Sequence, residues 1–287
     1  MLSHHTVDKL EAMGLGAMAD GLRQQMEQAQ YSELSFEERL GLLVDRKATW
    51  RENRRRQTRL YAAKLRHSAT VEEIDFRAPR GLDRAFVLGL AEAGWVQAHH
   101  NLLLTGATGC GKSFVACAPA HAAIRNGHTA LYVRTPRLLS DLALARGDGR
   151  YPHLLAKLAR TELPVLDDFL LTPVSPDETK DLLELTEDRN QLRSTMVVSQ
   201  LPVDSWHQAI PDPTLADAIL DRLVQNAHRI ALKGGSSCRR SGMTSLTLER
   251  SPGTTKGCGK CRPVDSPGRS RPRPSLGTAG LPAIRLA

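Results

Sequence analysis

From Val7 to Met26, apolar residues recur every two to four positions, which is close to the spacing of one face of a helix, and residues 1–66 as a whole read as helical. This stretch contains little glycine and no proline. Ser35-Phe-Glu-Glu38 is a capping box, and it predicts a second helix that runs to about His67. The apolar positions of the first stripe are Val7, Leu10, Met13, Leu15, Met18, Leu22 and Met26. The pattern predicts an all-helical segment.

The pattern changes near residue 101, where short apolar runs begin to alternate with helical periodicity. Before that point lie a further capping box at Thr70-Val-Glu-Glu73, a loop at 77–81 and a helix expected from about Leu82. The apolar runs are apolar on both faces, which is typical of a parallel sheet covered by helices on two sides. The predicted strands are 101–105, 129–134, 163–167, 194–199 and 227–232, and the helices between them are 112–126, one that begins at Thr135-Pro136, 175–192 and 214–224.

A glycine-rich segment, Gly106-Ala-Thr-Gly-Cys-Gly-Lys112-Ser113, follows the first strand and opens the next helix. In this pattern, glycines allow the backbone to turn successive N–H groups toward an anion, and the helix adds its positive end. Lys112 supplies a cation for the terminal phosphates and Ser113 a hydroxyl for Mg²⁺. A glycine turn without a ligand is the alternative, and the flanking strand and helix disfavour it. The expected nucleotide-binding residues are Gly106, Ala107, Thr108, Gly109, Cys110, Gly111, Lys112, Ser113 and Phe114.

Two acids, Asp167 and Asp168, end the predicted strand 163–167. A neighbouring parallel strand would bring them to the sheet edge at which the glycine-rich segment lies. We predict that Asp167 binds Mg²⁺ with Ser113, and that Asp168 polarises a water for attack on the γ-phosphate. A surface pair of acids is the alternative. The second acid favours hydrolysis over transfer to a small acceptor. The strand 129–134, between the loop and the acids, fits the motor and AAA+ branch of P-loop ATPases rather than simple kinases.

Polar residues in two later elements are further candidates for catalysis. Ser199 and Gln200 end a strand, where either side chain could sense the γ-phosphate or hold the attacking water, although polar strand ends are common. Arg222 follows Asp221 near the end of a helix. It could serve the nucleotide of a neighbouring subunit as an arginine finger, or form a surface pair with an acid. The predicted catalytic residues are Lys112, Asp168, Gln200 and Arg222.

A basic stretch covers residues 46–66. Arg51, Arg55 and Arg59 lie four residues apart on one helix face, with Arg54 beside them. Such a row can follow the phosphates of DNA, and no pattern that reads bases is visible. We therefore predict binding to double-stranded DNA, largely insensitive to sequence, through these four arginines; a solvated charged helix is the alternative. The residues of another face, which are Trp50, Tyr61 and Leu65, are expected to pack rather than to stack on bases.

Charge is distributed unevenly along the chain. Its 287 residues include 39 Lys and Arg against 31 Asp and Glu. Eleven of the basic residues and only two acids follow residue 232, so the part before is close to neutral. We expect the segment 241–287, rich in Ser, Gly, Pro and Arg, to be disordered. Its one CxxC pair, Cys258 and Cys261, lacks the further ligands that a zinc site needs.

No apolar run approaches the length of a membrane span. The N-terminal residues include acids and histidines and no apolar segment typical of a signal peptide. We therefore expect a cytoplasmic protein with no membrane partner.

Five stretches resemble, in this order, the IstB-like transposition helper ATPases of bacterial insertion sequences, which are relatives of the DnaC helicase loader: ELSFEERLGLLVDRKATWRENRR, IDFRAPRGLDRA, NLLLTGATGCGKS, LALARGDGRYPHLLAKLARTELPVLDDF and LADAILDRLVQNAHRIALKG. The resemblance covers about residues 1–240. It implies an α/β P-loop NTPase core of the AAA+ type at 69–240, preceded by a small all-helical domain at 1–68 that binds DNA or a partner. It also implies ATP and Mg²⁺ as cofactors, ATP-dependent self-association on DNA, DNA bending, and recruitment and stimulation of the transposase of the same element.

Position by position, the resemblance makes Gly106–Ser113 the Walker A loop, Asp167 and Asp168 the Walker B acids, Gln200 the sensor 1 residue, Arg222 the arginine finger and Arg239 the candidate sensor 2 arginine.

Three features depart from the family pattern. Gln200 stands where Asn is usual, Pro119 falls inside the helix after the Walker A loop, and the tail resembles nothing in the family. An internal proline costs about 3 kcal/mol, and a kink there would tilt the loop. Two alternatives to a transposition helper therefore stay open: a DnaC-like replicative helicase loader, which differs in its partner, and a hydrolysis-deficient, nucleotide-gated DNA-binding module.

Overall fold

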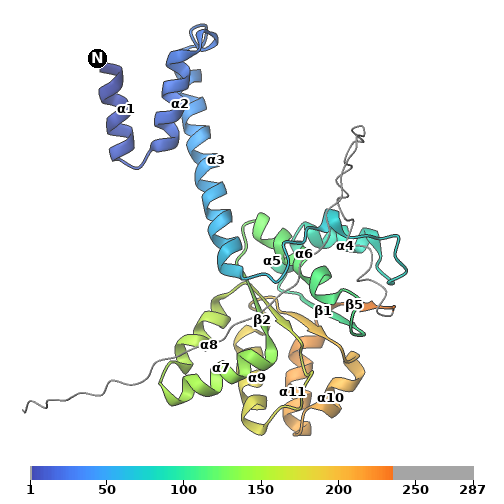
Figure 1. The fold of residues 1–287 in the computed structure, drawn as a ribbon. Coiled ribbons are helices and arrows are strands. Elements are labelled where there is room, and N and C mark those ends of the chain that lie inside the picture. Colours follow the sequence, from blue (N-terminus) through green and yellow to red (C-terminus); the bar gives the residue numbers. More distant parts are fainter. Residues whose placement is uncertain (1, 235–287) are drawn as a thin grey trace, which may run out of the picture. The chain divides into compact units, whose positions relative to one another are not determined.

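The computed structural model describes residues 2–234, in which a set of helices is followed by a sheet with helices on both faces (Figure 1). The described residues belong to one compact unit. The predictions for the segment 241–287, for Cys258 and Cys261 and for Arg239 lie outside the described residues.

Three helices form the N-terminal part: α1 (Leu2–Ala12), α2 (Gly16–Glu27) and α3 (Phe36–Ala63), with a 3-10 turn, η1 (Ala29–Tyr31), between the last two. The capping box is confirmed, because Ser35 accepts a hydrogen bond from the Glu38 backbone and donates its own N–H to the Glu38 carboxylate at 2.8 Å. α3 ends earlier than expected because Lys64 adopts a left-handed conformation with φ of 50°. Across residues 2–234, no helix is long and apolar enough to span a membrane.

The expectation that Trp50 and Tyr61 pack is wrong. Tyr61 is 90% exposed and Trp50 is 42% exposed. Cations cover the Trp50 ring instead, with Lys47 Nζ at 4.5 Å and Arg54 at 5.2 Å from its centroid. Of the three residues, only Leu65 packs against the core. In the described chain, the face of α3 that carries Trp50 and Tyr61 is thus largely open to solvent.

Five parallel strands form one sheet in the order β2-β3-β4-β1-β5. Their bounds are β1 (Asn101–Gly106), β2 (Ala130–Arg134), β3 (Leu163–Asp167), β4 (Met196–Ser199) and β5 (Ala227–Leu232). The predicted parallel sheet is confirmed. The expectation that the strand of the acids neighbours the strand of the loop is wrong, because β4 pairs with both β1 and β3 and so lies between them.

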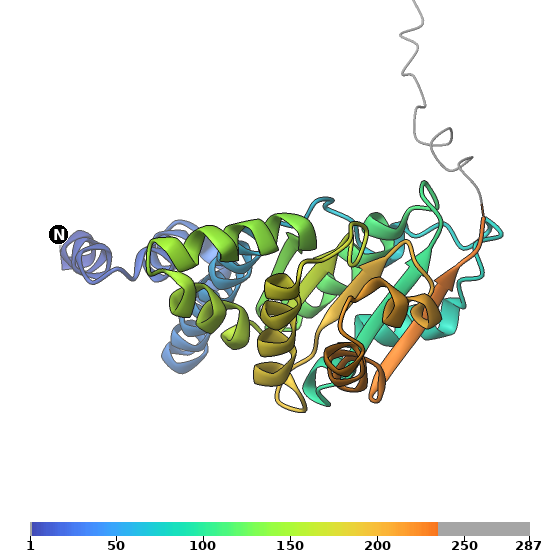
Figure 2. The same cartoon turned by 90° about the horizontal axis from the view of Figure 1, so that it is seen from below.

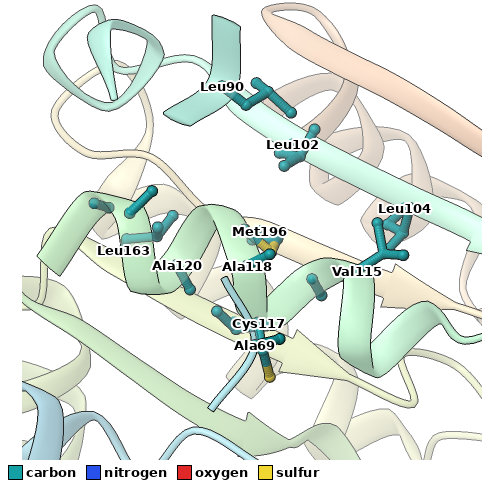
Figure 3. Packing of buried hydrophobic residues seen from close by; sticks show 14 of the residues in the cluster. Ala69, Leu90, Leu102, Leu104, Val115, Cys117, Ala118, Ala120, Leu163 and Met196 are labelled. Carbon is teal, nitrogen blue, oxygen red and sulfur yellow. The ribbon is translucent and has the colours of Figure 1, made fainter. Parts of the chain in front are cut away.

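Alternate residues of the central strands pack into two different hydrophobic clusters. Leu102 and Leu104 of β1 belong to the same cluster as Val115 of α6 (Lys112–Arg125), and Leu104 lies beside Val115 in Figure 3. Leu103 lies in the cluster on the opposite face, together with Val197 of β4. Because successive strand side chains point to opposite faces, a strand buried on both sides must be apolar throughout, which is what made these runs recognisable.

Helices cover the two faces of the sheet separately (Figure 2). The cluster with Leu102 includes residues of α3, the turn η2 (Val71–Glu73), α4 (Arg84–Ala91), α5 (Gly94–Gln97) and α6. The cluster with Leu103 includes residues of α7 (Thr135–Gly147), α8 (Tyr151–Arg160), α9 (Pro176–Arg189), α10 (Trp206–Ala209) and α11 (Pro213–Val224). A further 3-10 turn, η3 (Val203–Ser205), precedes α10.

α6 continues as one helix through Pro119, whose ring is buried in the core. The proline removes one helical donor, but the helix is not broken. Ser113 lies in the first turn of this helix, and its hydroxyl makes the contact with Asp167 that is described below.

Arg189, a buried arginine near the end of α9, binds several backbone carbonyls at once. It is 2% exposed and donates to the carbonyls of Leu158 at 2.6 Å and Thr161 at 2.7 Å. These carbonyls end α8, so the guanidinium satisfies acceptors that the helix leaves open. Its Nε also donates to the Thr195 hydroxyl at 2.9 Å. Arg189 thus ties α8, α9 and the start of β4 together, a role that the sequence pattern did not reveal.

The stretch LARGDGRYP forms the corner between α7 and α8. Arg146 and Tyr151 both bind Asp181 of α9, the tyrosine hydroxyl at 2.6 Å. The Arg146 guanidinium also lies over the Tyr151 ring, at 4.7 Å from its centroid. Because Asp181 is 1% exposed, these contacts pin the corner against α9.

Candidate nucleotide-binding site

The glycines of the Walker A loop adopt positive φ angles, as we expected for a backbone that turns its N–H groups toward an anion. Gly106, Gly109 and Gly111 have φ of 153°, 87° and 89°. At Gly106 a Cβ would lie 2.7 Å from the Leu232 carbonyl oxygen, so the close approach of β5 also requires glycine there. Gly111 is the residue before α6, whose free N–H groups face the loop. These features form an anion-binding concavity.

Lys112 lies inside this loop. Its Nζ donates to the carbonyls of Gly106 at 2.7 Å and Ala107 at 2.9 Å, and the residue is 9% exposed. A nearly buried ammonium held within the loop provides the positive charge that β- and γ-phosphates require.

Ser113 and Asp167 meet as the sequence predicts. The Ser113 hydroxyl donates to Asp167 Oδ2 at 2.8 Å, and the Asp167 side chain is 2% exposed. These are hard oxygen donors of the kind that Mg²⁺ prefers, so the two residues fit a magnesium ion. Within residues 2–234 no three His, Cys, Asp or Glu side chains are grouped to hold a metal. A magnesium ion here would therefore depend on nucleotide phosphates and water for its other ligands.

Asp168 lies in an ion pair. Its Oδ2 accepts from Arg134 Nε at 2.8 Å, and Arg134 is the last residue of β2. Asp168 has a left-handed backbone with φ of 57°, which is uncommon for a residue with a side chain. Its N–H donates to Asp167 Oδ1 at 2.9 Å, so the two acids hold each other's orientation.

Gln200 and Ser199 have different surroundings, which separates the two candidates for the γ-phosphate sensor. The Ser199 hydroxyl is buried and donates to the Phe169 carbonyl at 2.8 Å. The Gln200 Oε1 accepts from the Thr108 hydroxyl of the Walker A loop at 2.5 Å. The Ser199 hydroxyl therefore serves a structural hydrogen bond, whereas Gln200 contacts the Walker A loop.

Arg222 lies at the other end of the sheet from its own Walker A loop. The Asn101 side chain, at the start of β1, donates to the Arg222 carbonyl at 3.1 Å, whereas the loop follows the end of β1. Six residues of strand span roughly 17 Å, so Arg222 cannot reach its own nucleotide. Its Nη2 forms an ion pair with Glu187 of α9 at 2.6 Å rather than with Asp221. It lines an open surface groove of about 730 Å³ together with Arg229.

The four arginines predicted to bind DNA differ in their contacts. Arg51 and Arg55 are exposed, and among residues 2–234 neither has a hydrogen bond or ion pair. Arg54 is exposed but lies over Trp50. Arg59 is partly buried, and its Nη1 lies 3.7 Å from the position of a Cβ at Gly127. Within the described residues, two of the four guanidinium groups thus have no hydrogen-bond, ion-pair or ring partner.

A model of the family described as IstB-like ATP binding protein matches residues 8–245 of this chain. The chain belongs to the IstB-like family. An insertion sequence ATP-binding protein of Sinorhizobium fredii (strain NBRC 101917 / NGR234) is 50% identical to this IstB-like chain over 236 residues, which cover 82% of this chain and 96% of the relative. The ATP-binding protein of insertion sequence IS1162 from Pseudomonas fluorescens is 44% identical over 203 residues, 70% of this chain and 88% of the relative.

The IstB-like chain shares its fold with the solved structure of a helicase loader. The crystal structure of the DnaC helicase loader superposes with a TM-score of 0.50 at 17% identity, over 60% of this chain and all of that one. At this identity the likeness concerns the fold. The protein is thus an IstB-like ATP-binding protein whose fold is related to that of the DnaC helicase loader.

Four residues that lie near the nucleotide site of this IstB-like protein were not identified from the sequence. Tyr132 of β2 donates its hydroxyl to Asp167, and Arg66 Nη1 lies 3.9 Å from the same carboxylate. Arg80 Nη1 lies 3.5 Å from the position of a Cβ at Gly111, and its Nε is buried without a partner in the described chain. His67 contacts the ring of Phe114, with 6.0 Å between centroids.

Little in the sequence indicates that these residues lie near the nucleotide site. Tyr132 looked like an ordinary strand residue, and Arg66 and Arg80 lie in loops far along the chain from the residues they approach. The ring of Phe114, a predicted nucleotide-binding residue, packs against the core and against His67 in the segment after α3.

Proposed function

We propose that this IstB-like protein hydrolyses Mg·ATP and uses the nucleotide to assemble on DNA and to recruit and stimulate the transposase of its insertion sequence. The observation that carries the proposal is the 2.8 Å contact between Ser113 and Asp167, because it joins the Walker A loop to an acid of β3 at one edge of the sheet. Two oxygen donors beside an anion-binding loop are what a magnesium nucleotide requires.

For hydrolysis, Lys112 holds the terminal phosphates and neutralises the charge that develops on them. Ser113 and Asp167 hold magnesium, which supplies further charge stabilisation when bound. Asp168 accepts a hydrogen bond from the attacking water and orients it. For this, Asp168 must exchange its contact with Arg134 for one with water. Gln200 reaches the same region from β4 and contacts the γ-phosphate or this water.

For assembly, Arg222 contacts the nucleotide of a neighbouring protomer. Its distance from its own loop favours a role in trans, and the open groove beside it gives access to a second chain. In that arrangement, each nucleotide lies between two protomers, so that ATP binding favours self-association.

For DNA binding, the exposed face of α3 follows phosphates of double-stranded DNA. Arg51 and Arg55 have no partner in the described chain, which supports this role. Contacts to phosphates carry no base information, so binding is largely independent of sequence. The relatives named for insertion sequences support a transposase, rather than a replicative helicase, as the partner.

The decisive experiment measures ATP hydrolysis by the wild type and by Lys112→Ala, each with and without duplex DNA. We expect hydrolysis that DNA stimulates in the wild type, and no ATP-dependent oligomer of Lys112→Ala in sedimentation. Pull-down with the element's transposase and with a replicative helicase then identifies the partner. ATP binding without hydrolysis would overturn the ATPase proposal and favour a nucleotide-gated DNA-binding module, and capture of the helicase alone would favour a loader.

A further inference from the structure

Three side chains from separate elements converge on one oxygen of Asp167. Oδ2 accepts from the Ser113 hydroxyl at 2.8 Å and from the Tyr132 hydroxyl, and Arg66 Nη1 lies 3.9 Å away. In the described chain, Arg66 forms the only ion pair of this carboxylate. Asp167 is nearly inaccessible, whereas the Arg66 side chain is 52% exposed. Of the two partners, only Arg66 is thus open to solvent.

The surroundings of Tyr132 and Arg66 raise the pKa of both groups. Burial, and then the acceptor Asp167, raise the pKa of Tyr132, so its hydroxyl stays a donor. The Tyr132 hydroxyl, and after it Asp167 and Asp168, raise the pKa of Arg66, so its guanidinium stays charged. Arg66 therefore supplies a permanent cation beside the acid that we expect to hold magnesium.

The segment that carries Arg66 connects α3 directly to α6. Arg66 follows the end of α3 at Ala63, and the next residue, His67, contacts the ring of Phe114 in the first turn of α6. Cys117, one helical turn further, lies against the backbone of the same segment. α3 in turn carries the exposed arginines Arg51 and Arg55. A displacement of α3 therefore reaches the Walker A helix and Asp167 through one short connection.

We propose that Arg66 is a positioning residue of the magnesium site, held by Tyr132, and that it links DNA bound along α3 to the binding of Mg·ATP. The guanidinium and a metal ion compete for the same carboxylate, so Arg66 weakens magnesium binding in the free protein. DNA on α3 draws the Arg66 segment away from Asp167 and removes this competition. By linkage, Mg·ATP and DNA then strengthen each other's binding. The coupling to DNA rests on the function proposed above.

The test is an equilibrium titration of a fluorescent ATP analogue at increasing Mg²⁺, with and without duplex DNA. In the absence of DNA, Arg66→Ala should reach half-maximal binding at about two- to fivefold lower Mg²⁺ than the wild type, because an ion pair with one exposed partner is weak. DNA should lower the Mg²⁺ requirement of the wild type and leave that of Arg66→Ala unchanged. Arg66→Lys, which keeps the charge, should restore the wild-type behaviour.

Matched variants separate this role from a structural one. Arg77→Ala removes an exposed arginine from a nearby loop and should behave as the wild type. Tyr132→Phe keeps the ring but loses the hydroxyl that holds Arg66, and it should weaken the response to DNA. An identical Mg²⁺ requirement in Arg66→Ala, Arg77→Ala and the wild type would overturn the proposal. A wild type that does not bind DNA would overturn the DNA-binding function, while the titration without DNA would still test Arg66.

Discussion

The Ser113 hydroxyl lies 2.8 Å from Asp167 Oδ2, although 54 positions separate the two residues in the chain and β4 separates their strands in the sheet. The contact exists because all five strands are parallel, so that the loop after β1 and the acid at the end of β3 emerge at one edge. The magnesium site thus depends on the strand order as much as on the two residues.

Asp167→Asn should weaken the Mg²⁺-dependent binding of ATP by about 10- to 100-fold, because the amide lacks the charge that attracts the metal. Titration of a fluorescent ATP analogue with Mg²⁺ and with EDTA measures the effect. Asp177→Asn is the control, since Asp177 is exposed at the start of α9 and, among residues 2–234, its side chain forms an ion pair with Lys180 alone. Equal Mg²⁺ dependence of the two variants would remove Asp167 from the metal site.

Arg222→Ala should reduce ATP hydrolysis by about 10³-fold if the guanidinium acts at a neighbouring nucleotide. Mixing it with Lys112→Ala should recover part of the rate, because Lys112 of one variant and Arg222 of the other can then complete one shared site. Glu187→Ala is the matched control: it breaks the ion pair of Arg222 but keeps the guanidinium. A mixture no more active than its components would contradict a shared site.

Replacing Arg51 and Arg55 with Ala should make DNA affinity less sensitive to salt. The slope of log affinity against log salt concentration should become shallower by about 2, since each lost phosphate contact contributes about 0.9. Fluorescence anisotropy with a labelled duplex at several salt concentrations measures this slope. Arg59→Ala should change it less, because Arg59 is partly buried beside Gly127. A slope unchanged in the double variant would place DNA elsewhere.

Arg80→Ala should weaken ATP binding by about tenfold or more, because a guanidinium next to Gly111 can donate charge-assisted hydrogen bonds to phosphate. The control is Arg77→Ala, an exposed arginine of the same loop. Binding of ATP, ADP and AMP should show that the loss grows with the number of phosphates. The same loss in Arg77→Ala would indicate a general effect of charge.

Arg189→Ala should lower the free energy of unfolding by about 3–5 kcal/mol, because it leaves buried carbonyls at the end of α8 without donors. Urea denaturation followed by circular dichroism measures the change. Arg193→Ala, which removes a side chain with no hydrogen bond in the described chain, should change stability by about 0.5 kcal/mol or less. Comparable stabilities of the two variants would show that the carbonyls find other donors.

The features that the sequence alone determined are local. The positive φ values of Gly109 and Gly111 and the capping box at Ser35 involve residues within a few positions of each other, so composition and spacing specify them. The apolar strands were equally readable, because burial on both faces excludes polar residues. From these features followed the parallel sheet, the phosphate-binding loop and the acids that face it.

The tertiary structure alone decided which distant residues meet. It inserted β4 between β1, which precedes the loop of Ser113, and β3, which ends at Asp167. It also brought Tyr132 and Arg66 to the same carboxylate oxygen. It left Tyr61 exposed as well, although we expected this ring to pack. The physical reason is that such contacts depend on strand order and on the direction in which α3 leaves the core. Neither follows from a local pattern, because one residue spacing is compatible with many long-range arrangements.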